Sequence, residues 1–170
     1  MRPRCPRRAK GFSLLELVIV VVILAIIAAI AIPRMSRGAR GADESALKSD
    51  LAVLRNAIDL YKAEHGGNVP TGTAAEVVNK LTLYSDENGN TSVTKDTSTG
   101  KVYGPYLKAV PNLPVGSKKG DATIVVVTGA TDTPPAVGNS GWWYNSTTGE
   151  VRANLADTEL GDEDKAYNAY

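Results

Sequence analysis

Apolar and polar positions divide the chain into three stretches of different period. Residues 17–32 form an uninterrupted run of sixteen apolar residues. Between residues 47 and 61, apolar side chains recur at spacings of four, three, four and three, which is the period of one helical stripe. From residue 66 onward, short apolar runs alternate with turn residues, as in a small domain that contains strands. The pattern predicts a long helix followed by a globular domain.

The apolar run is long enough to cross a bilayer. Counted from Phe12 to Ile32 it has 21 residues, of which only Ser13 and Glu16 are polar. A helix of that length spans roughly 30 Å, about the thickness of the hydrocarbon core. No face of it is polar, which argues against a helix lying on a membrane surface. We therefore expect residues 12–33 to form a transmembrane helix, and a soluble cytoplasmic enzyme is not expected.

The helical pattern continues beyond the apolar run to about residue 65. Its stripe comprises Leu47, Leu51, Leu54, Ile58 and Tyr61, and Gly66-Gly67 follows it as a C-terminal cap. Pro33 lacks an amide donor and tends to kink a helix. We expect one long helix interrupted near Pro33, with residues 34–65 as an amphipathic continuation. The alternative is a flexible linker at Gly38 and Gly41.

Residues 66–170 are expected to form an outer globular domain. The expected elements are a short helix at 73–83, an exposed loop at 85–100, irregular structure at 102–114, a strand at 122–129, and a hairpin at 141–154 that turns at 145–149. The predicted fold class is α+β, with the long N-terminal helix packed against a small antiparallel sheet.

Charge is segregated along the chain. The net charge is +1, which argues against a basic nucleic-acid-binding surface. Residues 1–11 carry five basic side chains and no acid, whereas the remainder has 14 basic and 18 acidic residues, a balance of −4. Three further basic residues, Arg34, Arg37 and Arg40, follow the apolar run. The positive-inside rule therefore predicts a cytoplasmic N-terminus and an outer domain on the opposite side.

Two cleavage sites are compatible with this layout. Ala29-Ile30-Ala31 resembles the site of an ordinary secretory signal. Gly11 offers a second site, before the apolar run. Cleavage there would free the amine of Phe12 and make Glu16 the fifth residue of the mature chain. Glu16 would then lie in the first helical turn, where an anion is favoured, and a neighbouring subunit's terminal amine is a natural partner for a carboxylate in lipid.

The stretch KGFSLLELVIVVVILAIIAAIAIP resembles the class III signal of type IV pilins and type II secretion pseudopilins. The resemblance implies that a prepilin peptidase cleaves after Gly11 and N-methylates Phe12. It further implies that Glu16 acts in assembly and that Pro33 breaks the helix. Residues 1–11 would be the leader that is removed, taking Cys5, the single cysteine, with them.

Two further stretches, YKAEHGG and GPYLK, are similar to those of major pseudopilins, although Asn68-Val69 stands before Pro70 where a tyrosine is common. The resemblance implies a non-enzymatic filament subunit in the bacterial inner membrane, with its C-terminal domain in the periplasm. Its partners would be copies of itself, prepilin peptidase, the assembly platform and minor pseudopilins. The alternative within this class is a type IV pilus major pilin for adhesion, motility or DNA uptake.

Other candidate chemistry is sparse. The sequence contains no P-loop, G-x-S-x-G or H-E-x-x-H motif, and His65, the single histidine, stands at the predicted helix end. Trp142 and Trp143 allow a second kind of protein, a secreted or anchored binding module with an aromatic platform. Strand alternation predicts one of the two in the core and the other on the surface.

The acidic C-terminal stretch is a possible calcium site. Its carboxylates are Asp157, Glu159, Asp162, Glu163 and Asp164, and calcium prefers six to eight oxygen ligands. Their spacing does not match an EF-hand, so the alternative is a solvated acidic tail, and the metal ligands are unknown.

Overall fold

The computed structural model describes residues 11–130, 133–136, 138–161 and 164–170; for residues 30–39 it describes the helical backbone only. The chain divides into two compact units, Met1–Ala39 and Arg40–Tyr170. We call Arg40–Tyr170 the outer unit.

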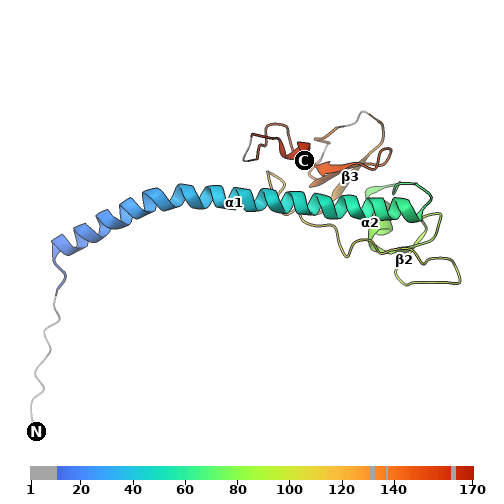
Figure 1. Cartoon of the computed structure of the whole chain (residues 1–170), viewed down its shortest axis with the longest axis horizontal. Helices are drawn as coiled ribbons and strands as arrows, with labels where there is room; N and C mark the ends of the chain where they lie inside the picture. Colours follow the sequence, from blue (N-terminus) through green and yellow to red (C-terminus); the bar gives the residue numbers. More distant parts are fainter. Residues whose placement is uncertain (1–10, 131–132, 137, 162–163) are drawn as a thin grey trace, which may run out of the picture. The chain divides into compact units, whose positions relative to one another are not determined.

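Helix α1 (Leu14–Glu64) is the longest element and contributes to both units (Figure 1). It ends as the glycine pair predicts. Gly66 and Gly67 have φ of 63° and 90°, and the amide of Gly67 donates to the Lys62 carbonyl at 2.8 Å. Such a left-handed C-terminal cap satisfies carbonyls that the helix leaves open. The prediction of one long helix reaching about residue 65 is confirmed.

Pro33 lies inside α1, so the backbone has no gap at the position where a helix break was expected. Proline removes one amide donor from the helix. The neighbouring turns keep their own donors, which is sufficient for the helix to continue through this position. The alternative of a non-helical linker at Gly38 and Gly41 is also not observed, because both glycines are helical.

Among the side chains that the structure describes, no helix combines the length and the apolarity needed to cross a membrane. The transmembrane prediction for residues 12–33 extends into residues 30–39, whose side chains lie outside that described part.

The stripe of α1 forms one wall of the outer unit's core. All five predicted stripe residues are at most 4% exposed. Helix α2 (Ala74–Thr82) packs Val77 and Leu81 into the same core. A capping box starts α2, because Thr73 and Glu76 exchange side-chain and backbone hydrogen bonds. The short helix predicted at 73–83 is therefore confirmed within one residue at each end.

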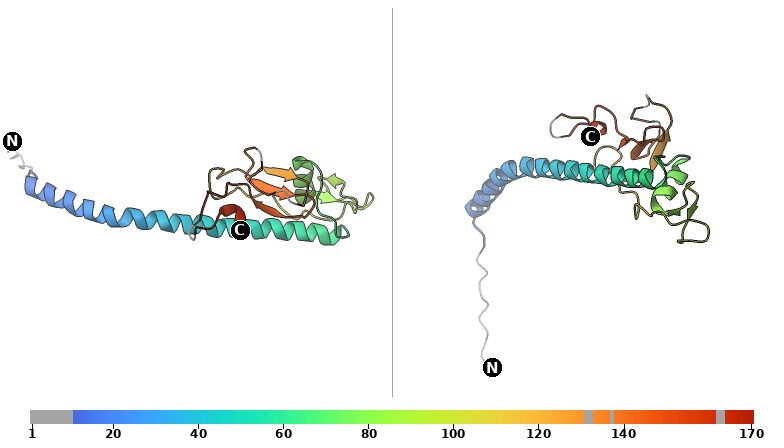
Figure 2. Two further views of the ribbon diagram at one scale, coloured as in Figure 1. Left: turned by 90° about the horizontal axis from the view of Figure 1, so that it is seen from above. Right: turned by 45° about the vertical axis from the view of Figure 1, so that its right-hand side comes forward.

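Five short strands form two sheets beside α1 (Figure 2). Strands β1 (Tyr84–Ser85) and β2 (Thr91–Ser92) are antiparallel. Strands β3 (Ile124–Val127), β4 (Trp142–Asn145) and β5 (Val151–Ala153) make the second sheet in that order. A 3-10 turn, η1 (Tyr167–Ala169), lies near the end of the chain. The α+β class is confirmed.

One pairing contradicts the expected antiparallel sheet. Strands β4 and β5 form the predicted antiparallel hairpin, but β3 pairs with β4 in parallel, with Ile124 opposite Trp142. Parallel neighbours need a crossover connection rather than a tight turn. The fourteen residues between β3 and β4, 128–141, supply it. Strand propensity carries no information about this direction, which is why the sequence did not predict it.

The prediction that one of Trp142 and Trp143 would be exposed is wrong. Trp142 is 0% and Trp143 1% exposed. Trp142 belongs to the core against α1, and Trp143 does not, so the two point to opposite faces as strand geometry requires. The crossover segment is fastened to Asn154, which accepts from the Ala136 amide and donates to the Ser140 carbonyl. Strand alternation sets the face to which each side chain points, but it does not determine whether that face is covered.

Candidate assembly and processing site

The first turn of α1 brings the predicted processing and assembly residues together. Ser13 precedes the helix, and its carbonyl accepts from the Leu17 amide at 3.2 Å. The Ser13 amide donates to a carboxylate oxygen of Glu16, Oε2, at 2.9 Å. This is one half of a capping box, in which an acid at the third helical position reaches back to the N-cap backbone. Glu16 therefore stabilises its own helix end.

The capping contact leaves one oxygen of Glu16 available. Within the described chain, hydrogen bonds reach Oε2 but not Oε1 of this carboxylate. The side chain is exposed and lies in the first turn, where the helix dipole favours negative charge. The arrangement holds a carboxylate in a fixed position with room for a cation.

Gly11 is not required by the folded structure. A Cβ built at this position meets no heavy atom within 4 Å. Gly11 is also not among the glycines of the described chain whose φ is positive. Neither packing nor backbone strain therefore demands glycine here. Phe12, the next residue, is 83% exposed, so the Gly11–Phe12 peptide bond is accessible.

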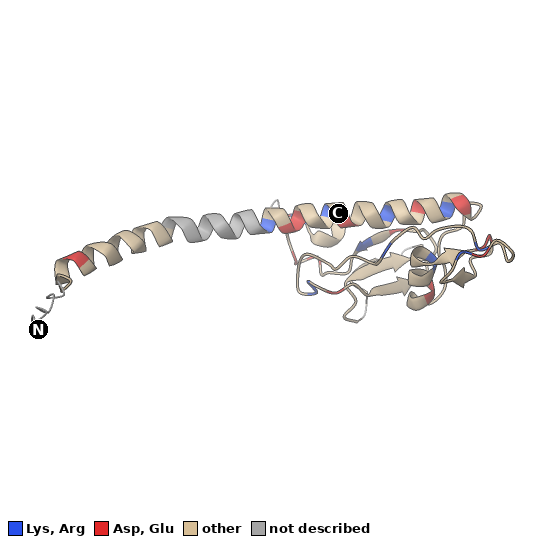
Figure 3. Ribbon diagram, turned by 90° about the horizontal axis from the view of Figure 1, so that it is seen from below, with Lys and Arg blue, Asp and Glu red and all other residues tan. Residues whose placement is uncertain are grey.

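The helix that follows carries an apolar surface on all its faces. Exposed fractions of its large apolar side chains run from 80% at Leu14 to 44% at Val18, and Ile27 is still 55% exposed. Glu16 is the single charged side chain among residues 14–29 (Figure 3). A helix that is apolar all round is stable in contact with lipid or with other apolar helices.

The outer half of α1 has an uncharged outward face. Successive residues are 100° apart around a helix, which places Ser49, Val53, Asn56, Leu60 and Ala63 opposite the buried stripe. All five are exposed, Val53 by 46% and Leu60 by 55%. The charged side chains of this half lie between that face and the core. A solvated helix normally places its charges on the outward face, so this face is typical of a helix that contacts another protein.

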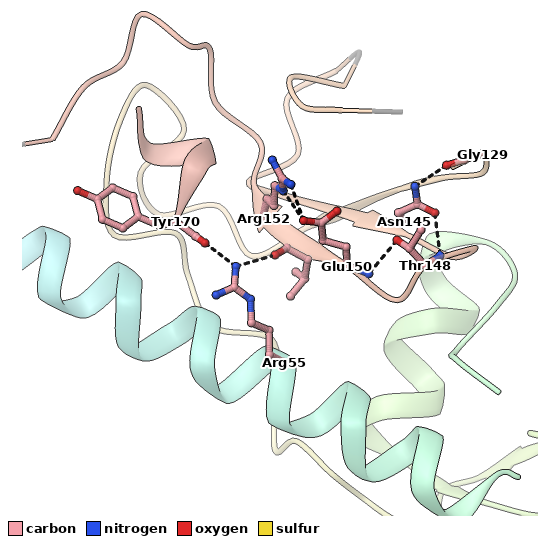
Figure 4. Close-up of polar contacts among 8 residues, drawn as sticks. Arg55, Gly129, Asn145, Thr148, Glu150, Arg152 and Tyr170 are labelled. Atoms are coloured by element: carbon pink, nitrogen blue, oxygen red, sulfur yellow. Dashed lines mark hydrogen bonds and ion pairs between the residues drawn. The ribbon is translucent and has the colours of Figure 1, made fainter. Parts of the chain in front are cut away.

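Arg55 joins α1 to the C-terminal part of the outer unit, a role that the sequence did not indicate (Figure 4). Its Nη2 donates to the backbone oxygens of Tyr170 at 2.6 Å and Val151 at 3.4 Å. The nearby hairpin is closed by Asn145, whose amide group donates to Gly129 and accepts from the Thr148 backbone. The two hydrogen bonds of Arg55 hold β5 and Tyr170 against α1.

His65 is buried rather than exposed at the end of α1. It is 2% exposed and stacks on Tyr61 with ring centroids 3.7 Å apart. Its Nδ1 lies 2.8 Å from the Tyr61 carbonyl, and its Nε2 lies 2.9 Å from the Asp86 carbonyl and 3.1 Å from Ser85 Oγ. Ser85 is 0% exposed. The Ser85–His65 pair thus lies away from solvent and joins the end of α1 to β1.

Two of the acidic residues near the C-terminus, Asp157 and Glu159, accept hydrogen bonds within the fold. Asp157 accepts from the Asn168 side chain, and Glu159 accepts from the amide and hydroxyl of Ser117. No group of three or more His, Cys, Asp or Glu arranged to hold a metal is found in the described part of the chain. Asp162 and Glu163 lie outside it, and the calcium site stays a prediction.

One family model matches the N-terminal region of the chain. The family model for the prokaryotic N-terminal methylation motif matches residues 6–32, a range that includes Gly11, Phe12 and Glu16. The match supports a type IV pilin-like class III signal and, with it, a type IV pilin-like filament subunit. Searches of the curated proteins and of the solved structures found no match to the chain.

Proposed function

We propose that this protein is a structural subunit of a type IV-like filament and, within that class, the major pseudopilin of a type II secretion system. The observation that carries the proposal is the methylation motif at residues 6–32, located on an apolar helix whose first turn holds Glu16. An exposed apolar helix with a fixed carboxylate at its start is suited to assembly rather than to catalysis.

In this proposal the precursor spans the inner membrane once through residues 12–33, with residue 1 in the cytoplasm and the outer unit in the periplasm. Prepilin peptidase hydrolyses the Gly11–Phe12 bond, and the new Phe12 amine is methylated. On assembly, Oε1 of Glu16 pairs with the Phe12 amine of a neighbouring copy. Pairing neutralises both charges as the helices leave lipid for the filament core, where an isolated charge is costly.

The uncharged outward face of α1 supports assembly through this helix. Val53 and Leu60 are exposed in the single chain, and no charged group accompanies them on that face. Contact with apolar helices of other copies would bury both side chains without burying an unpaired charge, which is a costly step at any interface. The filament therefore has an apolar core contributed by α1 and a shell of outer units.

The subfamily assignment depends on the GPYLK stretch. Tyr106 of this stretch donates to Glu64 at the end of α1, and the amides of Tyr106 and Leu107 donate to the Leu81 carbonyl, so the stretch joins α1 to α2. A type IV pilus major pilin remains the second candidate. Filament length in cells separates the two, since a secretion pseudopilus is short and a pilus extends from the surface. Burial of Trp142 and Trp143 removes the platform that a binding module would use.

The assembly role is tested with Glu16→Ala and Glu16→Gln in the full chain. Glu76→Gln is the matched control, because Glu76 occupies the same capping-box position at the start of α2. We expect both Glu16 variants to be cleaved and to remain in the membrane without forming filaments, while the control assembles. Normal filaments from Glu16→Ala would overturn the charge-pair role.

A further inference from the structure

A polar pocket lies at the C-terminal end of α1, in the outer unit. Its volume is about 550 Å³, which is within the usual range for small-ligand sites. Lys80 of α2 lines it together with the end of α1, the loop after α1, the loop between β1 and β2, and the turn after β4. Most of the lining side chains carry hydroxyl, amide or charged groups, so the pocket is suited to a polar ligand rather than to an apolar one.

Tyr61 contributes a hydroxyl group for which the fold provides no partner. Its side chain lines the pocket and is only 3% exposed, and no hydrogen bond within the described chain reaches the hydroxyl. The one polar side-chain atom of the described chain that is both fully enclosed and unpartnered is Trp143 Nε1, so the Tyr61 hydroxyl is open to the pocket. Burial, and then the charge of Asp86, raise the pKa of Tyr61 above its ordinary value. The phenol therefore keeps its proton and can donate it to a ligand.

Lys80 holds an ammonium group close to this hydroxyl. Its Nζ donates to the Thr71 carbonyl at 2.8 Å, and an ammonium group has three donors, so two remain for a ligand. A Cβ at Gly89 would lie 2.6 Å from the Tyr61 hydroxyl oxygen and 3.5 Å from Lys80 Nζ. The hydroxyl and the ammonium group thus border one space, and the glycine keeps that space free of a side chain.

The turn after β4 adds further donors to the pocket. The hydroxyl oxygen of Thr147 accepts from the Gly129 amide at 3.1 Å, and that of Thr148 accepts from the Glu150 amide at 3.3 Å. Each hydroxyl group also has one proton to donate, and these two contacts do not use it. The turn therefore fixes the two oxygen atoms and leaves their protons for a ligand.

The charges of the lining favour a negative ligand. Its lysine and acidic residues are Lys62, Lys80 and Glu87, which gives two positive charges against one negative charge. His65 also lines the pocket, but both of its ring nitrogens already contact the fold. A neutral ligand would leave the donors of Lys80 without a charged acceptor, whereas hydrogen bonds from an ammonium group to a carboxylate or phosphate are among the strong ones.

We propose that this pocket binds a small organic oxyanion, a molecule with several hydroxyl groups and one carboxylate or phosphate group. The acidic group lies between the Tyr61 hydroxyl and Lys80, and the hydroxyl groups of the ligand accept from Thr147 and Thr148. The pocket belongs wholly to the outer unit, so this binding activity does not depend on filament assembly.

Calorimetric titration of the full chain tests the proposal. The chain is kept in an uncharged polyoxyethylene detergent, which contains no sugar. The probes are glucuronate, glucose 6-phosphate and glucose, which share one ring and differ in the acidic group. We expect the two acids to bind and glucose to bind at least about tenfold more weakly, because it lacks the charged acceptor. The tighter of the two acids identifies the ligand as a carboxylate or a phosphate. Glucose binding as tightly as the acids, or no binding of either acid at millimolar concentration, would overturn the proposal.

Two single substitutions test the assigned position of the acidic group. Tyr61→Phe should lower the affinity for the tighter acid about threefold to tenfold and leave the unfolding temperature unchanged, because the hydroxyl has no hydrogen bond within the described chain. Lys80→Gln should lower it about tenfold or more. Lys95→Gln is the matched control, since Lys95 is exposed and lies outside the lining, and its affinity should equal that of the unmodified chain.

The outcomes of these substitutions are distinct from those for the filament. Unchanged affinity in Tyr61→Phe would overturn the assigned position of the acidic group, whether or not Lys80→Gln folds normally. Equal losses of affinity in Lys80→Gln and Lys95→Gln would show a general charge effect and overturn the pocket as the site. Neither result bears on assembly, which is tested through Glu16.

Discussion

Glu16 and Ser13 are joined by a hydrogen bond of 2.9 Å from the Ser13 amide to the Glu16 carboxylate. The acid to which we assign the assembly role is thus also a helix cap within its own chain. One carboxylate oxygen accepts this hydrogen bond, and no hydrogen bond within the described chain reaches the other. This division lets the carboxylate remain partly satisfied before a second copy arrives, which lowers the cost of keeping it at the start of an apolar helix.

The first prediction concerns Gly11. Because a Cβ at this position meets nothing within 4 Å, Gly11→Val should leave the thermal unfolding of the outer unit unchanged. The same variant should accumulate as uncleaved precursor, since the need for glycine then comes from the peptidase. Gel mobility and circular dichroism of the purified chain measure the two effects. Normal cleavage of Gly11→Val would contradict Gly11 as the processing residue.

The second prediction concerns Arg55. Arg55→Ala removes donors from the backbone oxygens of Tyr170 and Val151, and we expect a loss of about 1 kcal/mol in the free energy of unfolding, since the guanidinium is exposed. The control is Arg152→Ala, which breaks a surface pair with Glu150 and should cost less, about 0.5 kcal/mol. Urea denaturation measures both. Equal losses of unfolding free energy in the two variants would mean that the hydrogen bonds of Arg55 contribute no more than an ordinary surface ion pair.

The third prediction compares the two tryptophans. Trp142 Nε1 donates to the Pro111 carbonyl at 2.8 Å, whereas Trp143 Nε1 is buried without a hydrogen-bond partner among the described residues. Replacement by Phe removes the same atoms at both positions. Trp142→Phe should therefore cost about 1–3 kcal/mol more, because it leaves a carbonyl unpaired. A larger loss for Trp143→Phe, measured by urea denaturation, would show that its indole N–H has a partner.

The fourth prediction is a pH dependence at the loop that contains Asp96. Hydrogen bonds from Ser98 and then Thr99 lower the pKa of Asp96 from 3.8 to about 2. A carboxyl whose pKa is lower in the folded state stabilises it above the ordinary pKa, and that contribution is lost as pH falls from about 4 to about 2. Asp96→Asn should therefore flatten the fall in stability across this window.

The control for this experiment is Glu87→Gln. Glu87 lies between β1 and β2, and its side chain accepts none of the hydrogen bonds found in the described part of the chain. Thermal unfolding followed at several pH values compares the variants with the unmodified chain. An unchanged slope for Asp96→Asn would contradict the hydrogen-bonded carboxylate.

Local features of the structure were predictable from the sequence. The stripe from Leu47 to Tyr61 and the Gly66-Gly67 cap are set by neighbours within one or two turns, so period and turn chemistry predict them. The β4–β5 hairpin follows from local strand and turn signals in the same way. The methylation motif was recognisable for a similar reason, because its residues are contiguous.

Features that depend on distant parts of the chain were not predictable. The parallel pairing of β3 with β4 depends on the path of the crossover segment. The buried contacts of His65 are made with Ser85 and Asp86, 20 and 21 residues further along the chain, and the contact of Arg55 with Tyr170 joins residues 115 positions apart. Composition and hydrophobic periodicity contain no information on contacts between residues that are far apart in the sequence. Only the folded structure shows these contacts.

The central claim is that the chain is processed as a prepilin, and mass spectrometry of the N-terminal peptide of the mature protein tests it most directly. The account predicts a terminus at Phe12 whose amine carries a methyl group. A terminus at Ile32 would make residues 1–31 an ordinary signal, and an intact Met1 would make the segment a plain anchor. Either of these results would contradict the filament account.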